Sequence, residues 1–205
     1  MQERSQETRS RILQSAVKLF AEKGYEASGV AEICARSTVS KGSFYHHFHS
    51  KQSLFIELLK DWLQGLDVEL ARALRSATSV PEGLLAMAGQ MKGVFSAADG
   101  SIQLFLEFWQ QARREPRVWK EFISPYRRYQ QYFGKVIARG IEEGSIRPLD
   151  AKVAGQALVA LAVGILVQGV LDPKGGQWDK VARNAVEMLV SGMRTGQGAW
   201  PARGR

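Results

Sequence analysis

The spacing of apolar residues constrains the fold of this 205-residue chain more than any other feature. Apolar side chains recur every three to four positions along most of the sequence, which is the period of one face of an α-helix. Alternating apolar and polar runs and Asn-Gly turns, which mark β-strands and hairpins, are scarce. One apolar stripe comprises Ile12, Leu13, Ala16, Val17, Leu19 and Phe20. We therefore predict an all-α protein with about nine helices.

Residues suited to helix ends divide this pattern into elements. Ser, Asp and Pro favour helix starts, and Gly favours a residue just past a helix end. Pro125 falls inside one predicted helix and should cause a kink or a restart there. The first predicted helix runs from about Gln6 to before Gly24. A short second helix, capped by Ser28, contains Val30 and Cys34; a third, capped by Ser40, reaches about His47; and a fourth follows Ser50 and extends through Leu66. The remaining predicted helices are Pro81 to about Phe95, Ile102–Arg114, Val118–Glu143, Ala151–Leu171 with Asp150 as its cap, and Trp178–Thr195.

The charge and composition limit the partners of the chain. The formal net charge is +8, which favours a polyanion and nucleic acid first. Residues 1–51 hold eight Lys and Arg against five Glu, a net of only +3, so charge alone does not locate a nucleic-acid-binding segment. A single cysteine excludes an intrachain disulfide. No uninterrupted apolar run approaches about 18 residues, and the N-terminus lacks an apolar signal core, so we expect a cytoplasmic protein without a membrane span.

The stretch from Tyr25 to Lys51 carries the most specific signal. Two short helices joined by a tight turn make a helix-turn-helix, which places its second helix in the DNA major groove. That helix needs small or polar residues at its N-terminal tip and apolar anchors on its back. The tip residues are Ser40, Lys41, Gly42 and Ser43, and the anchors are Val39, Phe44 and Phe48.

These residues resemble the TetR family of transcription regulators. The sequence SKGSFYHHFHSKQSLF, from Ser40 to Phe55, is similar to that family's recognition helix and the start of its fourth helix, and RILQSAVKLFAEKGYEASGVAEI, from Arg11 to Ile33, is similar to its first two helices. The match covers about residues 9–60. Beyond it the likeness rests on length and helix count, with a weaker match at Leu104–Pro116.

The resemblance implies a ligand-responsive regulator. It implies a homodimer that binds a palindromic operator in double-stranded DNA, most often as a repressor, and that is released by a small-molecule effector. The implied domains are a DNA-binding domain over 1–52 and an effector-binding and dimerisation domain over 53–195. Residues 196–205 are expected to form a mobile tail.

The same resemblance assigns roles to individual residues. Lys41, Gly42 and Ser43 would face base edges, beside Ser40 at the helix tip. Tyr45, His46 or His47, and Lys51 would contact the DNA backbone. Ser28 would cap the second helix and reach a phosphate. Phosphate contacts set the register, and only the tip reads sequence. The chain departs from the family at Thr38, where Gly is usual, and Thr tolerates a left-handed turn poorly.

Each of these residues also has a plainer interpretation. Phe44 and Phe48 fit a core role, Lys41 could be a solvated side chain, and Tyr45 could pack on the first helix. His46, His47 and His49 suggest a metal site, but adjacent residues on a helix point about 100° apart and no Cys or carboxylate accompanies them at ligand spacing. We therefore expect neither a metal nor another cofactor, and we interpret Cys34 as buried filler rather than a redox sensor.

The second half holds candidates for an effector pocket. Aromatic side chains at helical spacing usually form core, but tyrosine hydroxyls need partners when buried, and small-ligand sites combine apolar walls with a few polar groups. We expect a small, largely apolar or aromatic effector. The pocket candidates are Trp62, Phe108, Trp109, Arg113, Phe122, Tyr126 and Tyr129.

The last two predicted helices are rich in small residues, which let helices approach closely. Packing within the chain would explain this, but the resemblance implies a four-helix dimer interface at the same place. The interface candidates are Ala157, Leu161, Gly164, Ala185, Met188 and Gly192.

Other classes of function stay open at this point. The sequence has no Gly-Xaa-Ser-Xaa-Gly elbow, no phosphate-binding Gly loop and no paired His-Glu metal motif, so we do not expect an enzyme. A helical protein–protein adaptor without DNA binding and a TetR-like activator remain as alternatives.

Overall fold

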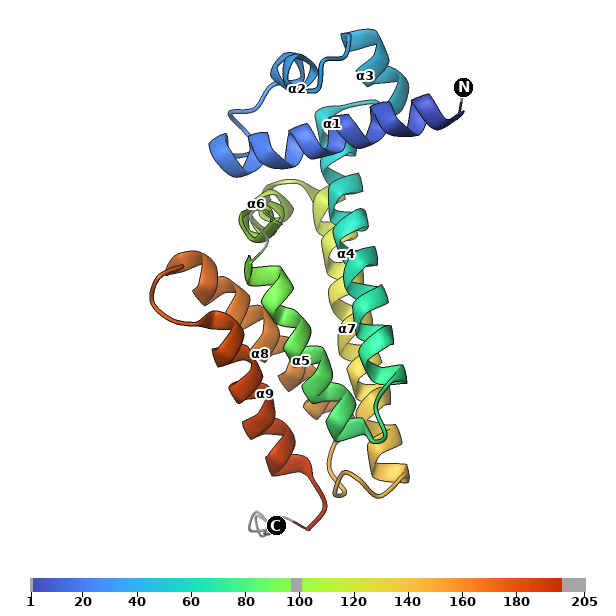
Figure 1. Cartoon of the computed structure of the whole chain (residues 1–205), viewed down its shortest axis with the longest axis vertical. Helices are drawn as coiled ribbons and strands as arrows, with labels where there is room; N and C mark the ends of the chain where they lie inside the picture. Colours follow the sequence, from blue (N-terminus) through green and yellow to red (C-terminus); the bar gives the residue numbers. More distant parts are fainter. Residues whose placement is uncertain (1, 97–100, 197–205) are drawn as a thin grey trace. The chain divides into compact units, whose positions relative to one another are not determined.

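A computed structural model describes residues 2–96 and 101–196 of the chain (Figure 1). This part of the chain contains nine helices and no β-strand, which confirms the predicted all-α fold. The helices are α1 (Gln2–Lys23), α2 (Val30–Ser37), α3 (Lys41–His47), α4 (Lys51–Arg75), α5 (Val80–Ser96), α6 (Ser101–Arg114), α7 (Pro116–Glu142), α8 (Ala151–Leu171) and α9 (Trp178–Met193). The predicted mobile tail falls, beyond residue 196, outside the described residues.

Capping residues explain why two helices begin where the sequence predicted. The Ser40 side chain accepts the backbone N–H of Ser43 at the start of α3. The Asp150 carboxylate accepts two backbone N–H groups of the first turn of α8. Each bond satisfies a donor that the helix itself leaves without a partner.

Other helix ends differ from the predicted ones. The N-cap of α2 is Gly29 and not Ser28, because the helix begins at Val30. The Ser28 hydroxyl donates to the carbonyl of Gly24. Helix α4 continues to Arg75, well past Leu66. Helix α7 runs through Pro125 as one element, so no restart occurs there.

The chain divides into two compact units. The first comprises the described residues of Met1–Leu66 and Ser96–Ile123, and the second those of Asp67–Phe95 and onward from Ser124. The division falls inside α4 and again inside α7, and it joins α6 to the N-terminal helices. The sequence analysis predicted two contiguous domains with a boundary after residue 52, whereas the first compact unit also includes a later segment of the chain.

The core of the first unit is largely aromatic. Helix α1 runs beneath α2 and α3 in Figure 1 and contributes the buried Phe20. Helix α4 contributes Phe55, whose ring centroid lies 4.2 Å from that of Phe108 in α6 and 4.5 Å from that of Tyr25. Helix α6 is therefore part of the same core as the predicted helix-turn-helix.

The core of the second unit includes a close crossing of two helices. A Cβ atom placed on Gly155 of α8 would lie 2.4 Å from the backbone nitrogen of Gly134 in α7. The two backbones can approach this closely only because Gly155 lacks a side chain. Helices α8 and α9 lie side by side, joined by the loop over residues 172–177 (Figure 1).

Helix α8 is predominantly apolar. By length and composition it could cross a membrane, with a mean hydropathy of 2.0, and only 33% of its most apolar window is buried. The prediction that no segment could span a membrane considered uninterrupted runs and overlooked this helix, in which Gln156 and Gln168 interrupt the apolar residues. One such helix is weak evidence for a membrane span, because core helices of soluble proteins have the same composition.

Candidate DNA-binding site

A left-handed residue joins α2 to α3. Thr38 has φ 57° and ψ 45°, and its backbone N–H donates to carbonyls at the end of α2. Within the described residues it is the one non-glycine residue with a positive φ. The turn therefore adopts the geometry that glycine would give more easily, and Thr38 carries the strain of a β-branched side chain there.

The recognition helix candidate, α3, is anchored on one face only. Phe44 and Phe48 are buried in the core of the first unit, with ring centroids 5.8 Å apart. On the opposite face Ser40, Lys41 and Gly42 are exposed, and Ser43 is half-buried. The fold thus presents the small and polar tip to solvent and fixes it from behind.

Tyr45 and the histidines complete the exposed face of α3. Tyr45 is 50% exposed, and its ring packs edge-on against Phe44. His46 is exposed and His47 is half-buried, with ring centroids 5.1 Å apart. Burial, followed by the charges of His46 and Arg9, lowers the pKa of His47. Among the residues that the structure describes, no three His, Cys, Asp or Glu side chains form a group that could hold a metal ion.

Two predicted phosphate contacts have other partners in the structure. Ser28 is 1% exposed, and its hydroxyl donates to the Gly24 carbonyl at 2.7 Å. Burial leaves its side chain no surface for DNA. The Lys51 ammonium donates to the carbonyls of Tyr25 at 2.8 Å and Ser28 at 3.0 Å, and it lies 4.1 Å from the centroid of the Tyr25 ring. Burial lowers the pKa of Lys51.

The structure assigns several predicted pocket residues to other environments. Phe108 is buried in the core of the first unit, where Trp62 and Phe122 pack at the edge. Trp109, 44% exposed, and Arg113 lie at the surface of the same unit. The tyrosines belong to the second unit: Tyr126 is half-buried, and the Tyr129 hydroxyl donates to Asp67 at 2.7 Å. Five of the seven candidates thus lie in the first unit and the two tyrosines in the second.

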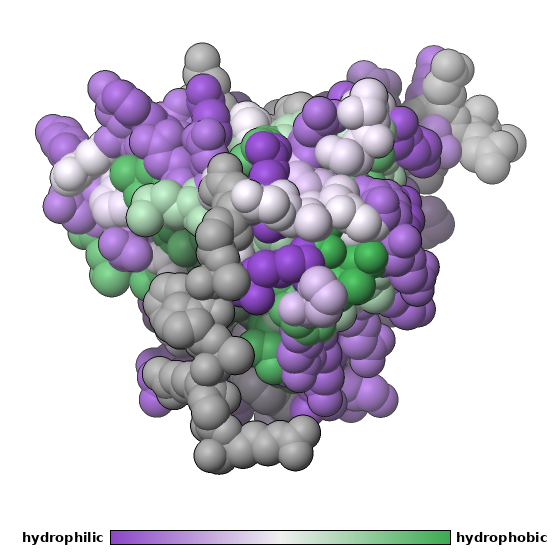
Figure 2. Space-filling model, turned by 90° about the horizontal axis from the view of Figure 1, so that it is seen from below, coloured by the Kyte–Doolittle hydropathy of each residue, from purple (hydrophilic) through white to green (hydrophobic). Residues whose placement is uncertain are grey.

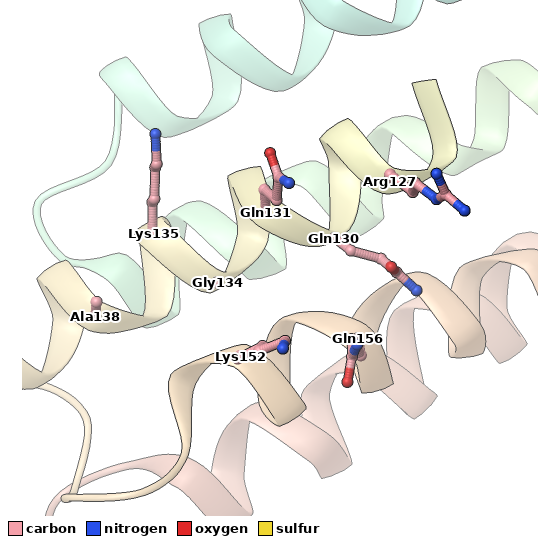
Figure 3. Close-up of a pocket in the computed structure, with 8 residues that line it drawn as sticks. All are labelled: Arg127, Gln130, Gln131, Gly134, Lys135, Ala138, Lys152 and Gln156. Carbon is pink, nitrogen blue, oxygen red and sulfur yellow. The ribbon is translucent and has the colours of Figure 1, made fainter. Parts of the chain in front are cut away.

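A groove of about 420 Å³ lies between α7 and α8 in the second unit (Figure 3). Gln130 of α7 and Lys152 and Gln156 of α8 lie along the gap between the two helices, whereas Lys135 extends from α7 away from α8 (Figure 3). None of the predicted pocket residues lines this groove. Its remaining lining residues are Arg127, Gln131, Gly134 and Ala138.

The predicted interface residues form part of the surface of α8 and α9. Figure 2 shows a mainly hydrophilic face on which hydrophobic residues form smaller patches. Of the large hydrophobic side chains described as exposed, half belong to α8 and α9, namely Val153, Leu171, Val181 and Met188, the last 77% exposed. Gly192 is exposed, and the other predicted interface residues, Ala157, Leu161, Gly164 and Ala185, are half-buried.

Sequence reasoning missed two residues of α6 that hold the turn between α1 and α2. The Glu107 carboxylate accepts the backbone N–H of Tyr25 at 2.9 Å. The amide of Gln111, which is buried, donates to the Glu26 carboxylate at 3.0 Å. Both residues lie more than 80 positions from their partners, so no local pattern could reveal them. A polar Gln on the buried side of an apolar helix was the available signal.

Comparisons with known proteins identify the family. Residues 12–58 match the model of the bacterial regulatory proteins of the tetR family, and residues 96–193 match that of the C-terminal segment of BetI-type transcriptional repressors. The chain is 30% identical over 144 residues to the HTH-type transcriptional repressor KstR2 of Mycobacterium tuberculosis, covering 68% of this chain and 70% of that protein. It is 26% identical over 170 residues to the HTH-type transcriptional regulator UidR of Escherichia coli, covering 81% and 83%.

Solved structures show the same fold. The transcriptional regulator FadR of Bacillus subtilis, in complex with stearoyl-CoA, aligns with a TM-score of 0.80 at 20% identity, over 90% of this chain and 99% of that one. A transcriptional regulator of Saccharomonospora viridis, in complex with choline, aligns with a TM-score of 0.78 at 23% identity, over 90% and 96%. These proteins are regulators rather than enzymes. With its helix-turn-helix and its helical C-terminal half, the chain belongs to the TetR family of transcription regulators.

Proposed function

We propose that this protein represses transcription as a homodimer that binds a palindromic operator through α3 and leaves it when a small molecule binds the C-terminal half. The observation that carries the proposal is the one-sided anchoring of α3. Its apolar residues are buried while Ser40, Lys41, Gly42 and Tyr45 are exposed in a row that fits the major groove. Such a protein acts on DNA, so we place it in the cytoplasm.

The proposed DNA contacts are those that the family resemblance implies for residues at the exposed or half-buried surface of α3. Lys41, Gly42 and Ser43 read base edges, with Ser40 beside them at the tip. Tyr45 donates its hydroxyl to a phosphate, and His46 or His47 contacts the backbone. These contacts divide into sequence reading at the tip and positioning along the rest of the helix.

Dimerisation through α8 and α9 is supported by their apolar surface. Val153, Leu171, Val181 and Met188 leave large hydrophobic side chains in water on two neighbouring helices. Several exposed large apolar side chains on one pair of helices are typical of a surface that another protein covers. A second copy of the chain would cover it, and a twofold dimer would bring two α3 helices to half-sites about 34 Å apart.

For the effector we propose a chemical class. The FadR relative binds stearoyl-CoA and the Saccharomonospora regulator binds choline, so the fold accommodates dissimilar ligands. We propose a small, largely apolar or aromatic effector for this chain. Thermodynamic linkage requires that, if the effector lowers the affinity for DNA by some factor, DNA lowers the affinity for the effector by the same factor.

The test begins with a duplex that the wild-type protein selects from a random library. Fluorescence anisotropy then compares Lys41→Ala and Tyr45→Phe with Lys174→Ala, which removes an exposed lysine from the loop after α8. We expect the first two to weaken binding about tenfold and the control to have no effect, with affinity falling steeply as salt rises. Failure to select any duplex, or equal affinity of all three variants, would contradict the proposal.

Two further measurements separate the parts of the proposal. Met188→Glu places a charge on the exposed apolar surface and should shift the sedimentation of the protein from dimer to monomer. An unchanged dimer would place the interface elsewhere. A reporter gene behind the selected duplex distinguishes repression from activation, since deletion of the regulator raises expression in the first case and lowers it in the second.

A further inference from the structure

The turn between α1 and α2 is bonded to charged side chains from two other helices. The backbone N–H of Tyr25 donates to the Glu107 carboxylate of α6 at 2.9 Å. The carbonyl of the same residue accepts from the Lys51 ammonium of α4 at 2.8 Å. A single residue in the turn thus has an anion at its donor and a cation at its acceptor, and hydrogen bonds to charged groups are stronger than neutral ones.

Additional contacts surround this arrangement. The Lys51 ammonium also donates to the carbonyl of Ser28 at 3.0 Å, so it holds the last residues before α2. Gly24, which ends α1 with φ +80°, would bring a Cβ atom to 3.3 Å from the Glu107 carboxylate. Glycine therefore gives the turn its shape and leaves room for that carboxylate.

The partners of the turn come from both family segments of the chain. Tyr25 and Lys51 lie in the segment that matches the tetR family model, whereas Glu107 lies in the segment that matches the C-terminal repressor model. All three residues nevertheless lie in the first compact unit. The helix-turn-helix is thus completed by a carboxylate that the C-terminal segment supplies.

We infer that Glu107 and Lys51 are positioning residues for DNA binding, which fix the α1–α2 turn so that α2 and α3 are held in the geometry that fits DNA. This inference rests on the proposed DNA-binding role of α3. Neither side chain needs to touch DNA for this purpose. If the turn loosens, only the fraction of molecules with α2 and α3 in place binds tightly, and the apparent affinity falls by that fraction.

The experiment uses full-length variants and the duplex selected by the wild-type protein. Glu107→Met removes the acceptor at similar length, and Glu107→Gln keeps an oxygen that can accept the Tyr25 N–H. The matched control is Glu121→Met, which removes a carboxylate of the same unit whose nearest cation, Lys60, is 3.9 Å away at the surface. We expect Glu107→Met to weaken binding about tenfold, and Glu107→Gln and Glu121→Met to stay within about threefold of wild type.

Hydrogen exchange distinguishes positioning from general stability. In the wild-type protein the Tyr25 amide should exchange slowly, and in Glu107→Met it should exchange much faster while amides in the middle of α1 keep their protection. Should Glu107→Met fail to fold, Glu107→Asp retracts the carboxylate by one methylene and keeps the charge, and Lys51→Met tests the other side of the turn.

The outcomes separate this inference from the proposed function. If the wild-type protein selects no duplex, the proposed function fails first. If it does select one and Glu107→Met, or Glu107→Asp in its place, binds it as tightly as Glu121→Met, the inference is wrong and Glu107 serves only the stability of the fold. Wild-type exchange of the Tyr25 amide at the rate of an unprotected amide would also overturn it.

Discussion

Replacing Thr38 by glycine should stabilise the protein. Thr38 occupies the left-handed region at φ 57°, where an L-residue costs about 1–2 kcal/mol relative to glycine. Its side chain is exposed, and its cap bonds to the end of α2 use only the backbone N–H, which glycine retains. The greater freedom of glycine in the unfolded chain opposes the gain by about 0.4–1 kcal/mol.

The net effect of Thr38→Gly should therefore be an increase of about 0.5–1 kcal/mol in the free energy of unfolding. For a chain of this size that corresponds to roughly 1–4 °C in the melting temperature. Urea denaturation followed by circular dichroism measures the first quantity, and calorimetry the second. Thr38→Ala is the matched control, because it removes the β-branch but keeps a Cβ atom in the strained region.

The order of stability of the wild-type protein and the two variants tests this reasoning. The reasoning requires Thr38→Gly to be more stable than the wild-type protein and Thr38→Ala to be less stable than Thr38→Gly. A glycine variant that is no more stable than wild type, or an alanine variant as stable as the glycine variant, would show that the left-handed conformation costs threonine no more than the freedom that glycine adds to the unfolded chain.

Two further predictions concern the stability of the folded chain. Gly155→Ala should lower the free energy of unfolding by about 1–3 kcal/mol, because the new methyl group would meet the backbone of Gly134 at 2.4 Å. Gly65→Ala, with open space around the new methyl group, should raise the free energy of unfolding by about 0.5–1 kcal/mol. Urea denaturation of both variants checks this. The hydroxyl of Ser145 and a backbone N–H at the start of α5 lower the pKa of Glu143 below 4.5. The ionised Glu143 carboxylate therefore contributes to stability above pH 4.5, and this contribution is lost as the pH falls through the lowered pKa. The stability difference between wild type and Glu143→Gln should thus shrink between about pH 6 and pH 3. A difference that stays constant with pH would contradict the assignment.

Local patterns predicted the elements of this fold well. Ser40 and Asp150 were recognisable as caps because a cap acts on backbone groups two or three residues away. Ser28 was misplaced as a cap because α2 begins one residue later, after Gly29, and the sequence does not show how the chain turns between α1 and α2. Helix α7 continues through Pro125, although proline removes a backbone donor there and local preference disfavours it.

The candidate site was predictable where it depends on one short segment. Exposure of Ser40, Lys41 and Tyr45 follows from their spacing relative to the buried Phe44. The bonds of Lys51 to the turn and of Glu107 to Tyr25 join residues 26 and 82 positions apart. A charged side chain in a sequence gives no sign of whether it faces a phosphate or a carbonyl of its own chain, and only the fold decides between them.

The thiol of Cys34 lies in the core of the first unit, 5% exposed, and burial raises its pKa. Since the chain has one cysteine, any reaction with a thiol reagent under native conditions reports the opening of the segment that carries α2. The protein therefore contains its own chemical reporter. The labelling rate with and without DNA would measure how firmly the bound duplex closes the helix-turn-helix, with no substitution in the chain.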